Sequence, residues 1–96
     1  MTKEELIDSI KNYFEGKPIA KAYLFGSMAR NEAVNNDVDI LIELEKNAHV
    51  TLIDFAHFIY ELELLLGKKV DLVSTKGLSP RIKPYIEKDK VLIYER

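Results

Sequence analysis

The chain has 96 residues, 47% of them hydrophobic, which suits one small domain with a modest core. It carries 14 Lys and Arg against 16 Asp and Glu, a net charge of −2. This balance argues against direct binding of duplex nucleic acid, which requires basic surface to meet phosphate. There is no cysteine, so disulfides and thiolate metal sites are excluded.

The N-terminal residues and the lengths of the apolar runs bear on where the protein is located in the cell. The opening residues, MTKEELIDSI, lack the basic and apolar segments of a secretory signal. No apolar run approaches the roughly 20 residues that span a bilayer. We therefore expect a soluble cytoplasmic protein in which residues 1–96 form a single domain.

Residues 2–15 predict an amphipathic helix. Thr2 and Glu5 make a T-x-x-E capping box, and Gly16 followed by Pro18 ends the pattern. The apolar positions recur at helical spacing; they are Leu6, Ile10, Tyr13 and Phe14.

Two strand patterns follow, separated by a short interruption. The apolar run over 19–25 predicts a central strand covered on both faces. Gly26 and Ser27 break it, and residues 28–31 predict a helical turn that Asn31 ends. The run over 38–44 predicts a second strand with alternating faces: Val38, Ile40, Ile42 and Leu44 on one, and Asp37, Asp39, Leu41 and Glu43 on the other.

The second half predicts a long helix, a strand, a short helix and an edge strand. Residues 51–66 form the long helix, which Gly67 ends. Residues 70–73 predict the strand, with Asp71 pointing away from its apolar neighbours. The expected apolar face of the long helix is Leu52, Phe55, Ala56, Ile59, Leu62 and Leu66.

The last helix is predicted to open at Ser79 as N-cap, with Pro80 in its first turn. Pro84 makes it short, kinked or late to start, and residues 91–94 predict the edge strand. The order helix–strand–turn–strand–helix–strand–helix predicts an α+β fold: a small mixed sheet backed by helices on one side.

Paired carboxylates on the second strand indicate a metal site. Asp37 and Asp39 share one face with Cα atoms roughly 6–7 Å apart. Carboxylates in this arrangement suit Mg²⁺, which often shares substrate phosphates. Asp71 is the natural third ligand, ranked above Glu43, which lies further along the strand.

The segment before these aspartates suits an anion. Gly26 allows a phosphate to approach the backbone, the Ser27 hydroxyl can donate a hydrogen bond, and a helix begins there. Arg30 can neutralise the same phosphates. Each feature alone is more often a turn or a solvated charge, so the prediction depends on their conjunction. His49 and His57 offer no convincing zinc site.

The stretch LFGSMARNEAVNNDVDILIEL resembles the signature of the DNA polymerase beta-type nucleotidyltransferase superfamily: Gly-Ser, Ala-Arg-Gly, a short loop and Ser-Asp-x-Asp. The short length and the ending VDLVSTKGLSPRIKPYIEKDKVLIYER are similar to the minimal nucleotidyltransferases (MNT), which are often paired with a HEPN-domain toxin. The resemblance covers almost the whole chain, from the first predicted strand to the end.

The resemblance implies roles for single residues. Gly26, Ser27 and Arg30 would bind the nucleotide phosphates, and Asp37 and Asp39 would bind two Mg²⁺ ions together with Asp71. Asp71 would also activate the attacking hydroxyl. Three departures from the pattern leave the strength of the activity open: Asn31 for Gly, Asn36 for Ser, and a loop one residue short.

The expected function is Mg-dependent transfer of AMP from ATP to a tyrosine hydroxyl of a HEPN toxin, in a homo- or hetero-oligomer. One alternative is a weak or inactive antitoxin that neutralises its partner by binding alone. A small-molecule nucleotidyltransferase is less favoured, because 96 residues leave no room for a second domain. A template-directed polymerase is less favoured still.

Overall fold

The computed structural model describes residues 1–30 and 37–96. Four strands form one sheet in the order β3-β2-β1-β4. Strand β1 pairs antiparallel with β2 and β4, and β2 pairs parallel with β3. The predicted mixed sheet is therefore confirmed. The strands are β1 (Ile19–Phe25), β2 (Val38–Leu44), β3 (Val70–Ser74) and β4 (Val91–Glu95).

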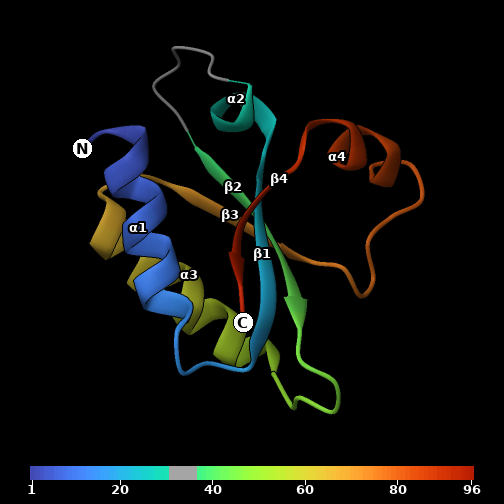
Figure 1. Cartoon of the computed structure of the whole chain (residues 1–96). Helices are drawn as coiled ribbons and strands as arrows, with labels where there is room; N and C mark the ends of the chain where they lie inside the picture. The colour runs from blue at the N-terminus through green and yellow to red at the C-terminus, as the bar shows by residue number, and fades with distance from the viewer. Residues whose placement is uncertain (31–36) are drawn as a thin grey trace.

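The two long helices, α1 (Lys3–Phe14) and α3 (Leu52–Leu66), lie together on one face of the sheet (Figure 1). Each begins with a capping box, at Thr2 in α1 and Thr51 in α3, which satisfies the N–H groups of the N-cap and of the third helical residue. Between helices and sheet lies the main core, with Leu6, Ile10, Phe14, Ile19, Ala22, Leu24, Val38, Ile40, Ile42, Leu62 and Val70 among its members.

The predicted apolar face of α3 is wrong in its first half. Leu52 is 88% exposed and Ala56 is also exposed, whereas Phe58 is buried. The helix is apolar almost all round, so its sequence did not define a single stripe. Packing against α1 selected the face, where the Phe58 ring meets the Tyr13 ring edge-on at 6.3 Å between centroids.

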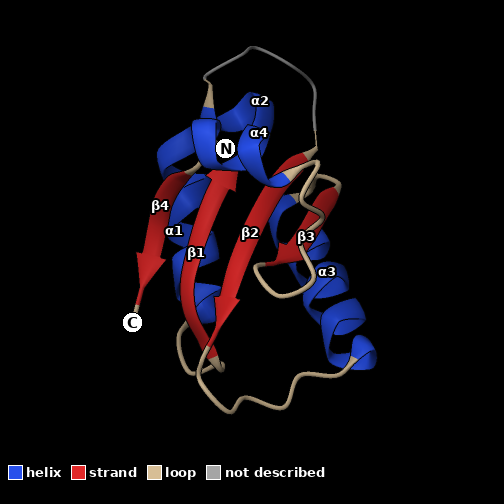
Figure 2. Cartoon of the chain, turned by 90° about the vertical axis from the view of Figure 1, so that its right-hand side faces the viewer, coloured by secondary structure: helices blue, strands red, loops and turns tan. Residues whose placement is uncertain are grey.

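Strand β1 is central, but it is not fully covered on both faces as predicted. Ile19, Ala22 and Leu24 are buried against the helices, while Tyr23 and Phe25 are only partly buried. The opposite face carries α4 (Lys83–Asp89), which lies with α2 (Gly26–Ala29) at one end of the sheet (Figure 2).

The last helix starts late, and Ser79 is not its N-cap. Helix α4 begins at Lys83, with Pro84 in its first turn, where the missing N–H costs nothing. The Ser79 carbonyl instead accepts hydrogen bonds from the N–H groups of Ile82 and Lys83, each at 3.0 Å, which forms a turn ahead of the helix.

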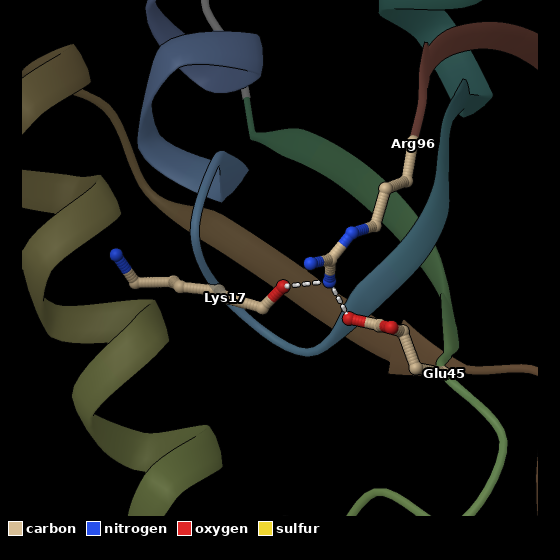
Figure 3. Close-up of polar contacts among 3 residues, drawn as sticks. All are labelled: Lys17, Glu45 and Arg96. Carbon is tan, nitrogen blue, oxygen red and sulfur yellow. Dashed lines mark hydrogen bonds and ion pairs between the residues drawn. The ribbon is translucent and has the colours of Figure 1, made fainter.

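Polar contacts join three segments at the opposite end of the sheet (Figure 3). The Arg96 guanidinium pairs with the Glu45 carboxylate and donates a hydrogen bond to the Lys17 carbonyl at 3.5 Å. These contacts lie away from the predicted site. Across the described ranges 1–30 and 37–96, no helix is both long and apolar enough to cross a membrane.

Candidate active site

Three neighbouring strands bring the predicted site residues to one end of the sheet, where β1 ends and β2 and β3 begin (Figure 2). Phe25 on β1 is the register partner of Asp39 on β2, and Asp39 is the partner of Asp71 on β3. Register partners project from the same face. All three line one pocket of about 270 Å³, which Ile86 of α4 and Ile82, in the turn before α4, help to enclose.

Gly26 packs directly against this site. Its φ is +74°, a left-handed conformation that side chains disfavour. A Cβ built at Gly26 would overlap Oδ2 of Asp39. The glycine therefore does two things here: it turns the chain from β1 into α2, and it leaves space for the Asp39 carboxylate beside the backbone.

The Asp39 carboxyl is in an unfavourable environment for a negative charge. Burial, a hydrogen bond with Asp71, and the charges of Asp71 and Asp37 raise its pKa from 3.8 to about 6, against the opposing influence of Arg30. Asp71 is exposed, so the pair is open to solvent on one side. A cation bound there would relieve the repulsion between the carboxylates.

Asp37 precedes β2 and is close enough to act electrostatically on Asp39. It does not line the pocket that Asp39 and Asp71 share. Across residues 1–30 and 37–96, no three acidic or histidine side chains converge closely enough to enclose a metal. The structure thus brings two of the predicted ligands together and leaves the third beside them.

Arg30 lies next to the site but contacts α4. Its guanidinium is 2.8 Å from the Asp89 carboxylate, while its charge still lowers the pKa of Asp39. Three predictions on this segment lie outside what the structure describes: those on Asn31 and Asn36, and that on the Ser27 hydroxyl.

Sequence reasoning missed the contribution of the C-terminal segment. Leu78, Ile82 and Ile86 line the site pocket, and Asp89 binds Arg30. Their spacing of four residues is typical of a helical stripe, although only Ile86 lies in α4 and is buried. Nothing in that spacing says which face of the sheet the helix covers.

Residues 8–96 match the family model "Polymerase beta, Nucleotidyltransferase". The chain therefore belongs to the polymerase beta-type nucleotidyltransferase family, and it is a nucleotidyltransferase by class. Its curated relatives include two proteins of Methanocaldococcus jannaschii. "Putative protein adenylyltransferase MJ1379" is 36% identical over 86 residues, covering 88% of this chain and 83% of the relative. A second protein with the same description, MJ0435, is 38% identical over 74 residues, covering 76% of this chain and 77% of the relative.

Solved structures agree with this family. One described as a "putative minimal nucleotidyltransferase" has a TM-score of 0.76 and 33% identity, with 95% of each chain covered. The MNT antitoxin in complex with a tri-AMPylated HEPN toxin from Shewanella oneidensis has a TM-score of 0.77 at 18% identity, covering 99% of this chain and 74% of that one. At that identity the Shewanella structure supports the fold alone.

Proposed function

We propose that this chain transfers AMP from Mg-ATP to the hydroxyl group of a tyrosine on a HEPN-domain partner protein. It would thereby act as the antitoxin of that protein. One observation carries the proposal: Asp39 and Asp71 are register partners in a shared pocket, and Gly26 packs without a side chain against Asp39. Paired carboxylates in a pocket beside a backbone turn suit the metal-bound phosphates of a nucleotide.

The carboxylate pair fits Mg²⁺. This ion commonly binds through one or two carboxylates and completes its shell with water and substrate phosphates. Asp39 and Asp71 supply two such ligands, and Asp37 adds negative charge beside them. When bound, Mg²⁺ neutralises the triphosphate and stabilises charge on the attacking and leaving oxygens.

The protein residues position the reaction. The acceptor oxygen forms a bond to the α-phosphorus of ATP, the bond to the α,β-bridging oxygen breaks, and pyrophosphate leaves. The hydroxyl proton passes toward the Asp71 carboxylate, the exposed member of the pair. Gly26 packs against Asp39 and the charge of Arg30 acts on it, which supports a role for both in holding the leaving phosphates. Most of the rate comes from positioning and charge neutralisation.

The relatives of this chain support a protein as the acceptor. The M. jannaschii relatives are named as protein adenylyltransferases. The Shewanella structure of the same fold is an antitoxin beside an AMPylated HEPN toxin, and a related toxin–antitoxin structure holds AMP-PNP. The Shewanella complex supports a HEPN protein as partner, and the structure with AMP-PNP supports ATP as donor.

The test is label transfer from α-³²P ATP with Mg²⁺, with and without the purified protein encoded by the neighbouring reading frame. We expect label on a tyrosine of that protein and none with Asp39→Asn. Glu43→Gln, on the same face of β2 but outside the pocket, is the matched control. Full transfer by Asp39→Asn would overturn the assignment of the carboxylate pair.

One observation favours a second function, that of an antitoxin acting by contact alone. Arg30, which the family pattern assigns to the phosphates, is paired with Asp89. If the site is inert, the partner is inhibited without being labelled, and calorimetry shows no Mg-dependent binding of ATP. Mg-dependent binding together with labelling would exclude this alternative.

A further inference from the structure

An apolar groove runs from the candidate active site past the edge of β3. We call it the β3-edge groove; it encloses about 440 Å³. It shares four residues with the site pocket that holds Asp39 and Asp71, so the two cavities adjoin. Its apolar lining is Leu52, Phe55, Leu72, Val73, Leu78 and Ile82.

Two apolar side chains that line the groove are largely exposed to solvent. Leu52 is 88% exposed and Ile82 is 51% exposed, although both line it. Leu52 comes from the start of α3 and Ile82 from the turn before α4. Lys76 is the only charged residue among the lining residues that the structure describes. Such a surface suits an apolar side chain of a ligand.

The direction of the reaction decides which ligand lies there. In the sheet order β3-β2-β1, Asp71 and Gly26 stand on opposite sides of Asp39. Attacking and leaving oxygens of phosphoryl transfer lie roughly in line through phosphorus. With the leaving pyrophosphate on the Gly26 side, the attacking hydroxyl would approach from Asp71 on β3, the strand whose Leu72 and Val73 line the groove.

We propose that the β3-edge groove binds the acceptor polypeptide, taking an apolar side chain that neighbours the modified hydroxyl. This inference rests on the proposed function and names the part of the chain that selects its acceptor. The groove would hold the polypeptide so that the hydroxyl reaches Asp71, while the nucleotide phosphates stay at Gly26. A rival occupant, the adenine base of ATP, is one of the outcomes tested below.

The test compares two adjacent exposed residues of α3. Leu52→Asp puts a charge into the groove, and Ile53→Asp is the matched control, because Ile53 is 69% exposed and does not line it. Both lie in the first turn, where an acid is tolerated. The acceptor is the protein encoded by the neighbouring reading frame. We expect Leu52→Asp to raise the KM for this acceptor by about tenfold or more. Ile53→Asp should change it less than about twofold, within the range of neutral surface substitutions.

Two further readouts separate the outcomes. Calorimetry with Mg-ATP should give the same Kd for both variants as for the wild type, and a Kd weakened only by Leu52→Asp would overturn the proposal in favour of the adenine base. An unchanged acceptor KM in Leu52→Asp would also overturn it. If the wild type labels nothing, the proposed transfer fails, and partner binding decides the groove. If Leu52→Asp weakens binding of the partner protein and Ile53→Asp does not, the result supports the groove as the binding site of the polypeptide. Any other result overturns that proposal.

Discussion

The Arg30 guanidinium and the Asp89 carboxylate lie 2.8 Å apart and join α2, beside the active-site glycine, to the end of α4. Arg30 is 46% exposed in its side chain, so the pair itself adds little stability, about 0–1 kcal/mol. Its importance lies in which anion the arginine contacts when ATP is present.

The first prediction separates a phosphate-binding arginine from a structural one. We expect Arg30→Ala to raise the KM for ATP about tenfold, in line with loss of one charge-assisted hydrogen bond. Asp89→Asn should lower that KM, because it removes the anion that competes for Arg30. Steady-state label transfer measures both. If the two variants behave alike, Arg30 serves only to hold α4.

The second prediction concerns Gly26. We expect Gly26→Ala to abolish transfer, because the new Cβ would displace the Asp39 carboxylate. It should also lower the free energy of unfolding by more than the roughly 1 kcal/mol that an alanine costs in a left-handed conformation. Gly16→Ala is the control: its φ is +83° and nothing lies within 4 Å of the added Cβ. It should show the backbone cost alone with normal activity. Chemical denaturation measures the stabilities.

The third prediction is the pH dependence of the metal-free protein. The pKa of Asp39 is raised from 3.8 to about 6 in the folded protein. Between these two pH values the folded protein therefore keeps a proton on Asp39 that the unfolded chain has already released. The free energy of unfolding should therefore fall as the pH rises through that window. Asp39→Asn should remove this fall and be more stable at pH 7 by about 1 kcal/mol, a value reduced for the partial exposure of the group.

Denaturant unfolding in EDTA at pH 4, 5, 6 and 7 measures this effect, with Glu43→Gln as the control on the same strand. A steeper fall in Asp39→Asn than in the wild type would contradict the environment assigned to Asp39. Adding Mg²⁺ at pH 7 should stabilise the wild type and leave Asp39→Asn nearly unchanged.

The fourth prediction tests Asp71 as the proton acceptor. We expect Asp71→Asn to lower kcat by about 10²- to 10⁴-fold, the usual contribution of a general base, while Mg-ATP still binds through Asp39. Asp8→Asn, an exposed acid on α1, should leave kcat unchanged. A variant that loses nucleotide binding but keeps its kcat at saturating ATP would assign Asp71 to metal binding alone.

The fifth prediction concerns a stabilising contact away from the site. The Tyr13 hydroxyl donates a hydrogen bond of 2.6 Å to Glu61 and joins α1 to α3. Tyr13→Phe should lower the free energy of unfolding by about 1 kcal/mol with normal AMP transfer. Tyr60→Phe, whose side chain is 62% exposed on α3, should change neither. Loss of transfer in Tyr13→Phe would show that helix packing controls the site.

Local patterns of the sequence were sufficient for most elements. The capping box predicted at Thr2 begins α1, and a second one, at Thr51, begins α3 although it was not predicted. The run over 38–44 gives the second strand with its observed bounds. The alternation of Val38, Asp39 and Ile40 also determined that Asp39 faces away from the main core, because strand side chains have a period of two.

Contacts between distant segments were decided only by the tertiary structure. Helix α3 is apolar on several sides, so only packing against α1 chose Phe58 over Ala56 for the interior. Pro84 made a late start one of three readings, and the turn at Ser79 selected it. The register of Asp39 with Asp71 and the pairing of Arg30 with Asp89 join residues 32 and 59 positions apart. No local pattern encodes such pairings, because they depend on how sheet and helices pack together.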